Sequence, residues 1–251
     1  MRALEEILDT PPGYLVDAEH VPVFGSTEWW GLSGEPRDVL RHGEEFIAAQ
    51  GAFGLAGPND INRLVVMDSL RFDENRSFVG STLTFLIEAM ADGVERMVIG
   101  SYSDLFDQDS RFLRIAEPRT GARLGRRRVS PSTGQVMSEF VFDFPLQRGD
   151  VTLLELEVIP VDGPEPAIHS TMWHSVRASS PVGLLMVTAD FDPECLPRRL
   201  EQEARTHLAD PNRSMITRDP LELLGTRACA HVDEVVEGGG LTLRWDWEEP
   251  R

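Results

Sequence analysis

Three consecutive arginines, Arg126, Arg127 and Arg128, form the longest basic run of the chain. A guanidinium group binds a phosphate or a carboxylate through two parallel hydrogen bonds, so the run is a candidate anion-binding site. The glycines before it and the Ser-Pro-Ser after it also indicate a hairpin tip or an edge strand, where charge prevents edge-to-edge pairing. The edge-strand interpretation is favoured, and the three arginines are retained as ligand-binding candidates.

Trp173 and His174 are the other two ligand-binding candidates, and they follow His169 in the stretch His-Ser-Thr-Met-Trp-His. Two histidines five residues apart in a strand point to opposite faces of the sheet. A metal shared by His169 and His174 would therefore need a bulge or a loop. We predict ordinary sheet residues here and no metal site.

Asp190, Asp192 and Glu194 alternate in the stretch Val-Thr-Ala-Asp-Phe-Asp-Pro-Glu-Cys. Three carboxylates along one edge would suit a hard cation. The Asp192–Pro193 pair is also typical of a strand that enters a turn, with the aspartate capping it and the proline at its first position. The turn interpretation is favoured.

The chain contains no lysine, and arginine supplies all 24 of its basic residues. A lysine Schiff base and a lysine-bearing phosphate loop are therefore excluded. The GxSxG, HExxH, GxGxxG and CxxC motifs do not occur either. We predict no catalytic residues and no cofactor, while acid–base chemistry by a histidine and carboxylates remains open.

Composition predicts a folded, acidic protein of 251 residues with 41% hydrophobic residues and a net charge of −18. A surface of this charge repels phosphate, which argues against nucleic-acid binding. We expect no membrane partner, because no segment is long and apolar enough to span a bilayer and the N-terminus has no signal core. Two cysteines suggest neither a disulfide framework nor a metal site, so we expect a bacterial, cytoplasmic protein.

The expected secondary structure divides the chain into two regions, a helical N-terminal segment of residues 1–60 and a β-rich domain of residues 61–251. Apolar spacing favours helices at 3–8, 35–50 and 80–92. Alternating or continuous apolar residues favour strands, which are expected at 62–67, 97–101, 111–115, 136–144, 151–161, 168–176, 182–191 and 241–247. The expected class is α+β and mainly antiparallel β, a sandwich or barrel-like sheet on which the helical N-terminal portion packs. Trp245 and Trp247 share the apolar face of the last strand and should lie in the core.

Residues 86–91, Leu-Ile-Glu-Ala-Met-Ala, resemble the central helix of hot-dog-fold dehydratases. The histidine motif that those enzymes carry before this helix is missing from residues 75–84. The resemblance implies an enzyme as an alternative function, without an identified catalytic residue.

The region from Arg126 to the end resembles the C-terminal part of actinobacterial regulators with an Xre-type helix-turn-helix. The matching segments are the turn Pro-Leu-Gln-Arg-Gly-Asp at 145–150, Phe-Asp-Pro at 191–193, and a glycine-rich turn followed by a tryptophan-bearing strand at 239–247. Residues 11–17 resemble the tail of such a helix-turn-helix, but too few residues precede Pro11 for the DNA-reading helix pair. The resemblance implies a sensory or regulatory β-domain.

These observations predict a non-catalytic regulatory or sensory module that binds a small molecule or a protein partner. An enzyme using histidine and carboxylate acid–base chemistry is one alternative. An acidic, immunity-type protein that neutralises a basic partner is another, and a binding interface for such a partner would be salt-sensitive. The sequence leaves the oligomeric state open.

Overall fold

The structure is a computed structural model that describes residues 60–101, 113–115, 118, 121–129, 136–160, 171–177, 181–206, 215–235 and 239–247. These residues form thirteen strands. In chain order they are β1 (Ile61–Phe72), β2 (Phe78–Ala89), β3 (Val94–Ser101), β4 (Leu113–Ile115), β5 (Ala122–Val129), β6 (Val136–Leu146), β7 (Val151–Pro160), β8 (Thr171–Arg177), β9 (Val182–Asp190), β10 (Arg199–Thr206), β11 (Met215–Leu221), β12 (Arg227–Val235) and β13 (Gly240–Asp246). For β4 and β8 only the backbone is described.

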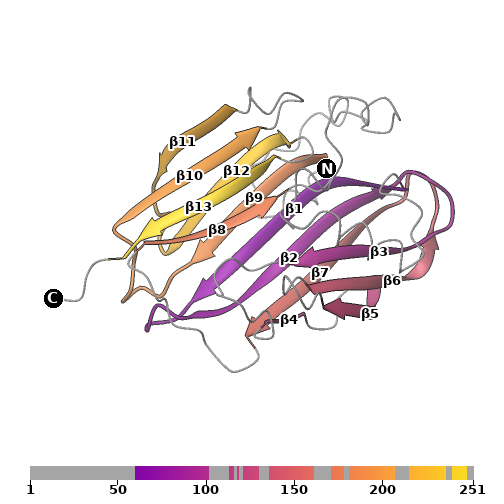
Figure 1. Cartoon of the computed structure of the whole chain (residues 1–251), viewed down its shortest axis with the longest axis horizontal. Coiled ribbons are helices and arrows are strands. Elements are labelled where there is room, and N and C mark those ends of the chain that lie inside the picture. The colour runs from indigo at the N-terminus through magenta and orange to yellow at the C-terminus, as the bar shows by residue number, and fades with distance from the viewer. Residues whose placement is uncertain are drawn as a thin grey trace.

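The strands make three sheets, shown in Figure 1. The largest has the order β12-β9-β1-β2-β7-β4, the second β11-β10-β13-β8, and the third β3-β6-β5. Only the β1–β9 pair is parallel among the described pairings. Buried side chains from all three sheets join in one hydrophobic cluster, so the two smaller sheets pack on one face of the six-stranded sheet.

The residues that face this core follow from the strand register. Directly opposed residues of an antiparallel pair lie on the same face. Val66 pairs with Phe85, and Phe85 pairs with Leu154, so these three side chains point into the core together. Their neighbours in sequence, such as Val65 and Leu86, point to the other face.

A β-bulge in β1 shapes the junction with β9. The register shifts between Arg63 and Val65, which leaves Leu64 as the extra residue. The Leu64 carbonyl oxygen would lie 2.7 Å from a Cβ atom added at Gly183. Glycine at this position therefore lets β9 approach the bulged strand closely.

The predicted α+β class was wrong for the described residues, which contain strands and no helix. The clearest correction concerns residues 80–92, expected as a helix, which lie mostly in β2 (Phe78–Ala89). Phe85 and Ile87 face the main core, whereas Leu86 belongs to a second buried cluster. A strand buried on both faces has no clean alternation, and its apolar residues then also fit a helical spacing.

The predicted helices at 3–8 and 35–50 lie outside the described residues, so the division into 1–60 and 61–251 stays a prediction. The strands expected at 62–67, 97–101, 136–144, 151–161, 168–176, 182–191 and 241–247 are confirmed as β1, β3, β6, β7, β8, β9 and β13. The strand expected at 111–115 is found as the shorter β4.

Candidate functional site

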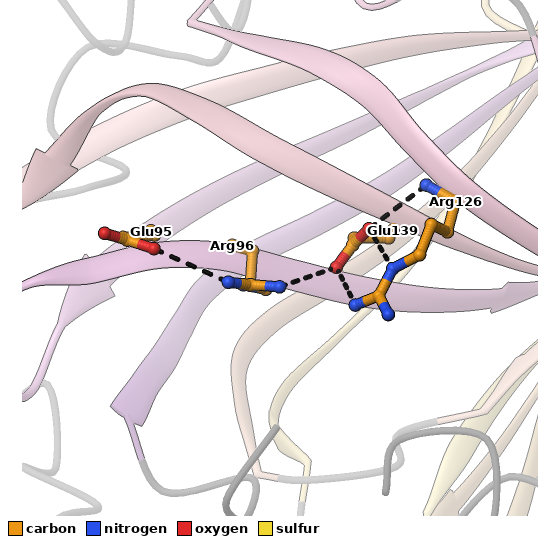
Figure 2. Close-up of polar contacts among 4 residues, drawn as sticks. All are labelled: Glu95, Arg96, Arg126 and Glu139. Carbon is orange, nitrogen blue, oxygen red and sulfur yellow. Dashed lines mark hydrogen bonds and ion pairs between the residues drawn. The ribbon is translucent and has the colours of Figure 1, made fainter. Parts of the chain in front are cut away.

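The ion cluster of the three-stranded sheet contains one of the predicted site residues, Arg126. Figure 2 shows Glu139, on the central strand β6, between Arg96 of β3 and Arg126 of β5. The side chain of Glu139 is 4% exposed, whereas that of Arg126 is 51% exposed. Each neighbouring strand therefore contributes one cation to a carboxylate buried between them.

Both carboxylate oxygens of Glu139 are engaged. Arg126 donates from its backbone N and from Nε to Oε2, at 3.1 and 2.9 Å, and from Nη2 to Oε1 at 2.7 Å. Arg96 donates from Nη1 to Oε1 at 3.1 Å. Glu95 Oε2 lies 3.5 Å from Arg96 Nη2 and extends the cluster to the surface.

A β-bulge in β5 allows this contact. The β5–β6 register shifts between Leu124 and Arg127, so Gly125 and Arg126 both lie within the irregular step. A Cβ atom at residue 125 would lie 2.8 Å from Glu139 Oε2. The glycine thus leaves room for the carboxylate, and the bulge re-aims Arg126 onto it.

The electrostatics of the cluster keep Glu139 ionised. The hydrogen bonds from Arg126 lower the pKa of Glu139 from 4.5 to about 2, and they outweigh desolvation, which acts in the opposite direction. The same contact raises the pKa of Arg126. A carboxylate with this pKa and with both oxygens occupied is a poor general base near neutral pH. The cluster is therefore suited to joining three strands.

The other predicted site residues lie apart from this contact. Arg127 and Arg128 of β5 pair with Ser138 and Met137 of β6. Trp173 and His174 lie on β8, in the four-stranded sheet, where their backbone partners on β13 are Arg244 and Leu243. The five candidates therefore belong to two different sheets, and a common ligand site for them stays a prediction.

An aromatic cluster lies where β1, β9 and β13 end. Phe72 contacts Phe191 at 5.5 Å and Trp245 at 5.2 Å between ring centroids, and Phe191 lies 5.4 Å from Trp247. Trp245 is 1% exposed and Trp247 is 4% exposed, which confirms that both tryptophans pack in the core. Among the described residues, their indole Nε1 atoms have no hydrogen-bond partner. Edge-to-face contacts instead direct the positive ring edge of one aromatic residue at the π face of another.

Two of the alternating carboxylates at residues 190–194, Asp190 and Asp192, accept hydrogen bonds from β12 and from the turn after β9. Asp190 accepts two hydrogen bonds from Arg227, at 2.8 and 3.0 Å. Asp192 Oδ1 accepts from the backbone N of Glu194 at 2.9 Å, and the Asp192 carbonyl accepts from Cys195 N. The turn interpretation is thus confirmed. Within the described residues, no group of three histidine, cysteine or acidic side chains is placed to hold a metal ion.

The turn between β6 and β7 carries a feature that the sequence did not reveal. Phe140 and Phe142 are buried, but Phe144 is 79% exposed despite the same alternation. Val94 and Arg96 pair with Leu146 and Val141, so β6 has three extra residues over this step. This irregularity releases Phe144 from the core. Pro145 was the only local signal of a break in the strand.

Comparison with known proteins gives no family assignment. No family model and no curated protein sequence matches the chain. A provisionally assigned protease from Parabacteroides distasonis is 9% identical with a TM-score of 0.44, over 76% of this chain and 41% of that protein. Native yeast LTA4 hydrolase is 8% identical with a TM-score of 0.41, over 74% of this chain and 29% of that protein. The chain thus spans less than half of either protein, and likeness at this level establishes neither a shared fold nor a shared function.

The resemblance to Xre-type regulators stays a prediction. Among the described residues, no helix is long and apolar enough to cross a membrane.

Proposed function

We propose that the chain is a non-catalytic regulatory or sensory module that binds a protein partner through the β6–β7 turn. The observation that carries the proposal is the exposure of two large apolar residues on either side of this turn, Phe144 at 79% and Val151 at 52%. Aromatic side chains supply much of the binding energy in protein interfaces when they insert into a pocket of the partner.

The turn that presents Phe144 is held firmly. Asp150 Oδ2 accepts from Gln147 N at 2.7 Å, and the Gln147 carbonyl accepts from Asp150 N at 2.9 Å. The neighbouring β2–β3 turn adds bonds from Gly149 N to the Ala89 carbonyl and from Arg148 N to Asp92 Oδ1. A contact residue on a preordered turn loses less conformational entropy on binding, and this supports a recognition role.

Charge defines the chemistry of the partner. Asp143 precedes Phe144 and is exposed, and the whole chain carries a charge of −18. The complementary surface is an apolar pocket with a basic rim, because opposite charges steer the encounter and like charges oppose it. Raising the salt concentration is expected to slow association more than it speeds dissociation.

The test is capture of partners by the full chain, compared between two matched variants. Phe144→Asp places a charge on the proposed contact, and Leu224→Asp does so at another exposed residue, which is 74% exposed in the β11–β12 turn. The proposal predicts a protein that co-purifies with the wild type and with Leu224→Asp but is lost with Phe144→Asp. Reconstitution from the two purified proteins must then give a defined complex.

Two results would overturn the proposal. One is a captured protein that binds Phe144→Asp as well as it binds the wild type. The other is native mass spectrometry that shows only a retained small molecule, which would favour a sensor of that molecule and return attention to Arg127, Arg128, Trp173 and His174. Circular dichroism of both variants checks that the strands are intact.

A further inference from the structure

The face of the six-stranded sheet that points away from the main core carries a buried apolar patch. We define the outer patch as Val65, Leu86, Leu184 and Met186, which are 4%, 7%, 6% and 9% exposed. Val65 pairs with Leu86 of β2 and with Leu184 of β9, so the three side chains lie on one face. Their sequence neighbours Val66, Phe85 and Leu185 belong to the main core on the opposite face.

Every described member of this cluster comes from the six-stranded sheet itself. Its partly buried neighbours are Leu64, Met67, Leu153 and Cys229, from β1, β7 and β12. Among the described residues, the two smaller sheets contribute no member to this cluster. Within the described part of the chain, no second layer therefore lies over the outer patch.

The burial of the patch is local. His231 and Asp233 of β12 pair with Met186 and Leu184 and share their face, yet both are exposed. A bare sheet face is expected to leave its central side chains in contact with water, as solvated antiparallel sheets do. Exposures of 4–9% in the centre of this face are lower than a solvated sheet face would give, so the outer patch is suited to an apolar cover.

The position of the patch indicates which segment covers it. Val65 and Leu184 stand near the first residues of the parallel strands β1 and β9, and Leu86 stands near the last residues of β2. The chain enters the sheet at this end of the strands, where the Asp60 carbonyl accepts a hydrogen bond from Met90 N at 2.9 Å. Residues 1–59 precede this point, and their apolar residues include Trp29, Trp30, Phe46 and Ile47.

We propose that the N-terminal segment of residues 1–59 docks on the outer patch and makes this face an interface within the chain. The segment directly precedes β1, one of the two middle strands of the sheet, whereas the other undescribed stretches are short connections between strands or the last four residues. It also carries ten carboxylates against three arginines, which gives it a net charge of −7 out of the −18 of the chain. This inference is independent of the contact proposed for Phe144.

Cys229 provides a native probe at the rim of the patch. It is half-buried, and burial raises the pKa of its thiol, so labelling is done at mildly alkaline pH. In the full chain with Cys195→Ser, Cys229 is labelled with a maleimide that carries a benzophenone. Irradiation and peptide mapping are expected to find cross-links from Cys229 to residues 1–59 within a monomer.

The matched control carries Cys229→Ser and the same label on Cys195, whose Sγ lies 2.7 Å from the Glu74 carbonyl oxygen. Its cross-links should reach the β1–β2 turn instead. Cross-links from Cys229 only to residues 102–112, 161–170 or 207–214 would overturn the proposal. Cross-links between two chains, or none at all from labelled Cys229, would overturn it equally.

A second measurement does not depend on labelling. Met186→Asp puts a charge in the patch at its most exposed member, and Leu224→Asp is the control. Trypsin cleavage at Arg37 and Arg41 should become at least about tenfold faster in Met186→Asp, because opening of a docked segment governs its proteolysis. Equal cleavage rates in wild type, Met186→Asp and control, with the strand signal retained, would contradict the docked segment.

Discussion

Glu139 makes the stability of the protein depend on pH. Its pKa is about 2 in the folded state and 4.5 ordinarily, so the unfolded chain binds a proton first as the pH falls. The stabilisation is therefore complete above about pH 4.5 and disappears as the pH falls towards 2. A shift of this size corresponds to about 3 kcal/mol, which we reduce to about 2 because the arginines are partly solvated.

The variant Glu139→Gln tests this origin of acid sensitivity. Urea unfolding at neutral pH should show that it is less stable than the wild type by about 2 kcal/mol, since Arg96 and Arg126 lose an ionised partner. The difference should shrink steadily below pH 4.5. A gap that stays constant down to pH 2.5 would show that the loss comes from packing and not from ionisation.

Gly80 is a residue at which a methyl group is not tolerated. Its φ is +145°, and an added Cβ would lie 2.8 Å from the Val158 carbonyl oxygen and 3.3 Å from the Arg71 guanidinium. Arg71 donates a hydrogen bond to Glu157 at 3.0 Å, and an added methyl group would crowd this arginine. We expect Gly80→Ala to destabilise the protein by about 1–3 kcal/mol, from backbone strain and the clash together.

Gly93→Ala separates these two causes. Gly93 also has a positive φ, of +76°, but no atom lies within 4 Å of its added Cβ. Urea unfolding should show a smaller loss for Gly93→Ala than for Gly80→Ala. Equal losses would mean that the contact with β7 contributes nothing.

At the scale of elements, β13 is the strand on which the four-stranded sheet depends. It lies between β10 and β8 and brings Trp245 and Trp247 into the aromatic cluster. Trp245→Ala is expected to cost about 3–5 kcal/mol, a large share of an ordinary domain stability. Deleting residues 241–251 should give insoluble or loosely folded protein. A deletion variant that keeps the melting temperature of the full chain would show that β13 is peripheral.

The sequence predicted most of those strands whose two faces differ or whose apolar run is continuous. The alternation of Leu241, Leu243 and Trp245 against Thr242 and Arg244 identified β13 correctly. The strands β10, β11 and β12 were missed, since charged and small residues interrupt their apolar pattern, and β10 and β12 also pair with the distant strands β13 and β9. Pairing partners that are far apart in sequence leave little local signal.

The candidate site was predictable only in part, for a similar reason. The arginine run pointed to Arg126, but its partner Glu139 lies 13 residues away across a bulge. Arg96 reaches the same carboxylate from another strand, 43 residues away. No residue pattern within one strand predicts such a cluster, because strand register and bulges bring its members together.

At the scale of the whole molecule, the negative charge predicts that the chain alone does not bind DNA. Nucleic-acid affinity depends largely on neutralising phosphates, and a net charge of −18 opposes this. Fluorescence anisotropy with a labelled duplex in roughly 150 mM salt should show no binding at micromolar protein concentrations. Submicromolar, salt-sensitive binding would mean that the arginines form a local basic surface.

The central claim is recognition of a protein partner through the exposed Phe144. The most direct test is calorimetric titration of the captured partner with the wild-type chain, Phe144→Ala and Leu224→Ala. Truncation of an anchor residue typically costs about 2 kcal/mol or more, so Phe144→Ala should bind about 30-fold more weakly. Leu224→Ala should bind within about twofold of the wild type, as residues outside an interface do. Equal dissociation constants for all three proteins would contradict the account.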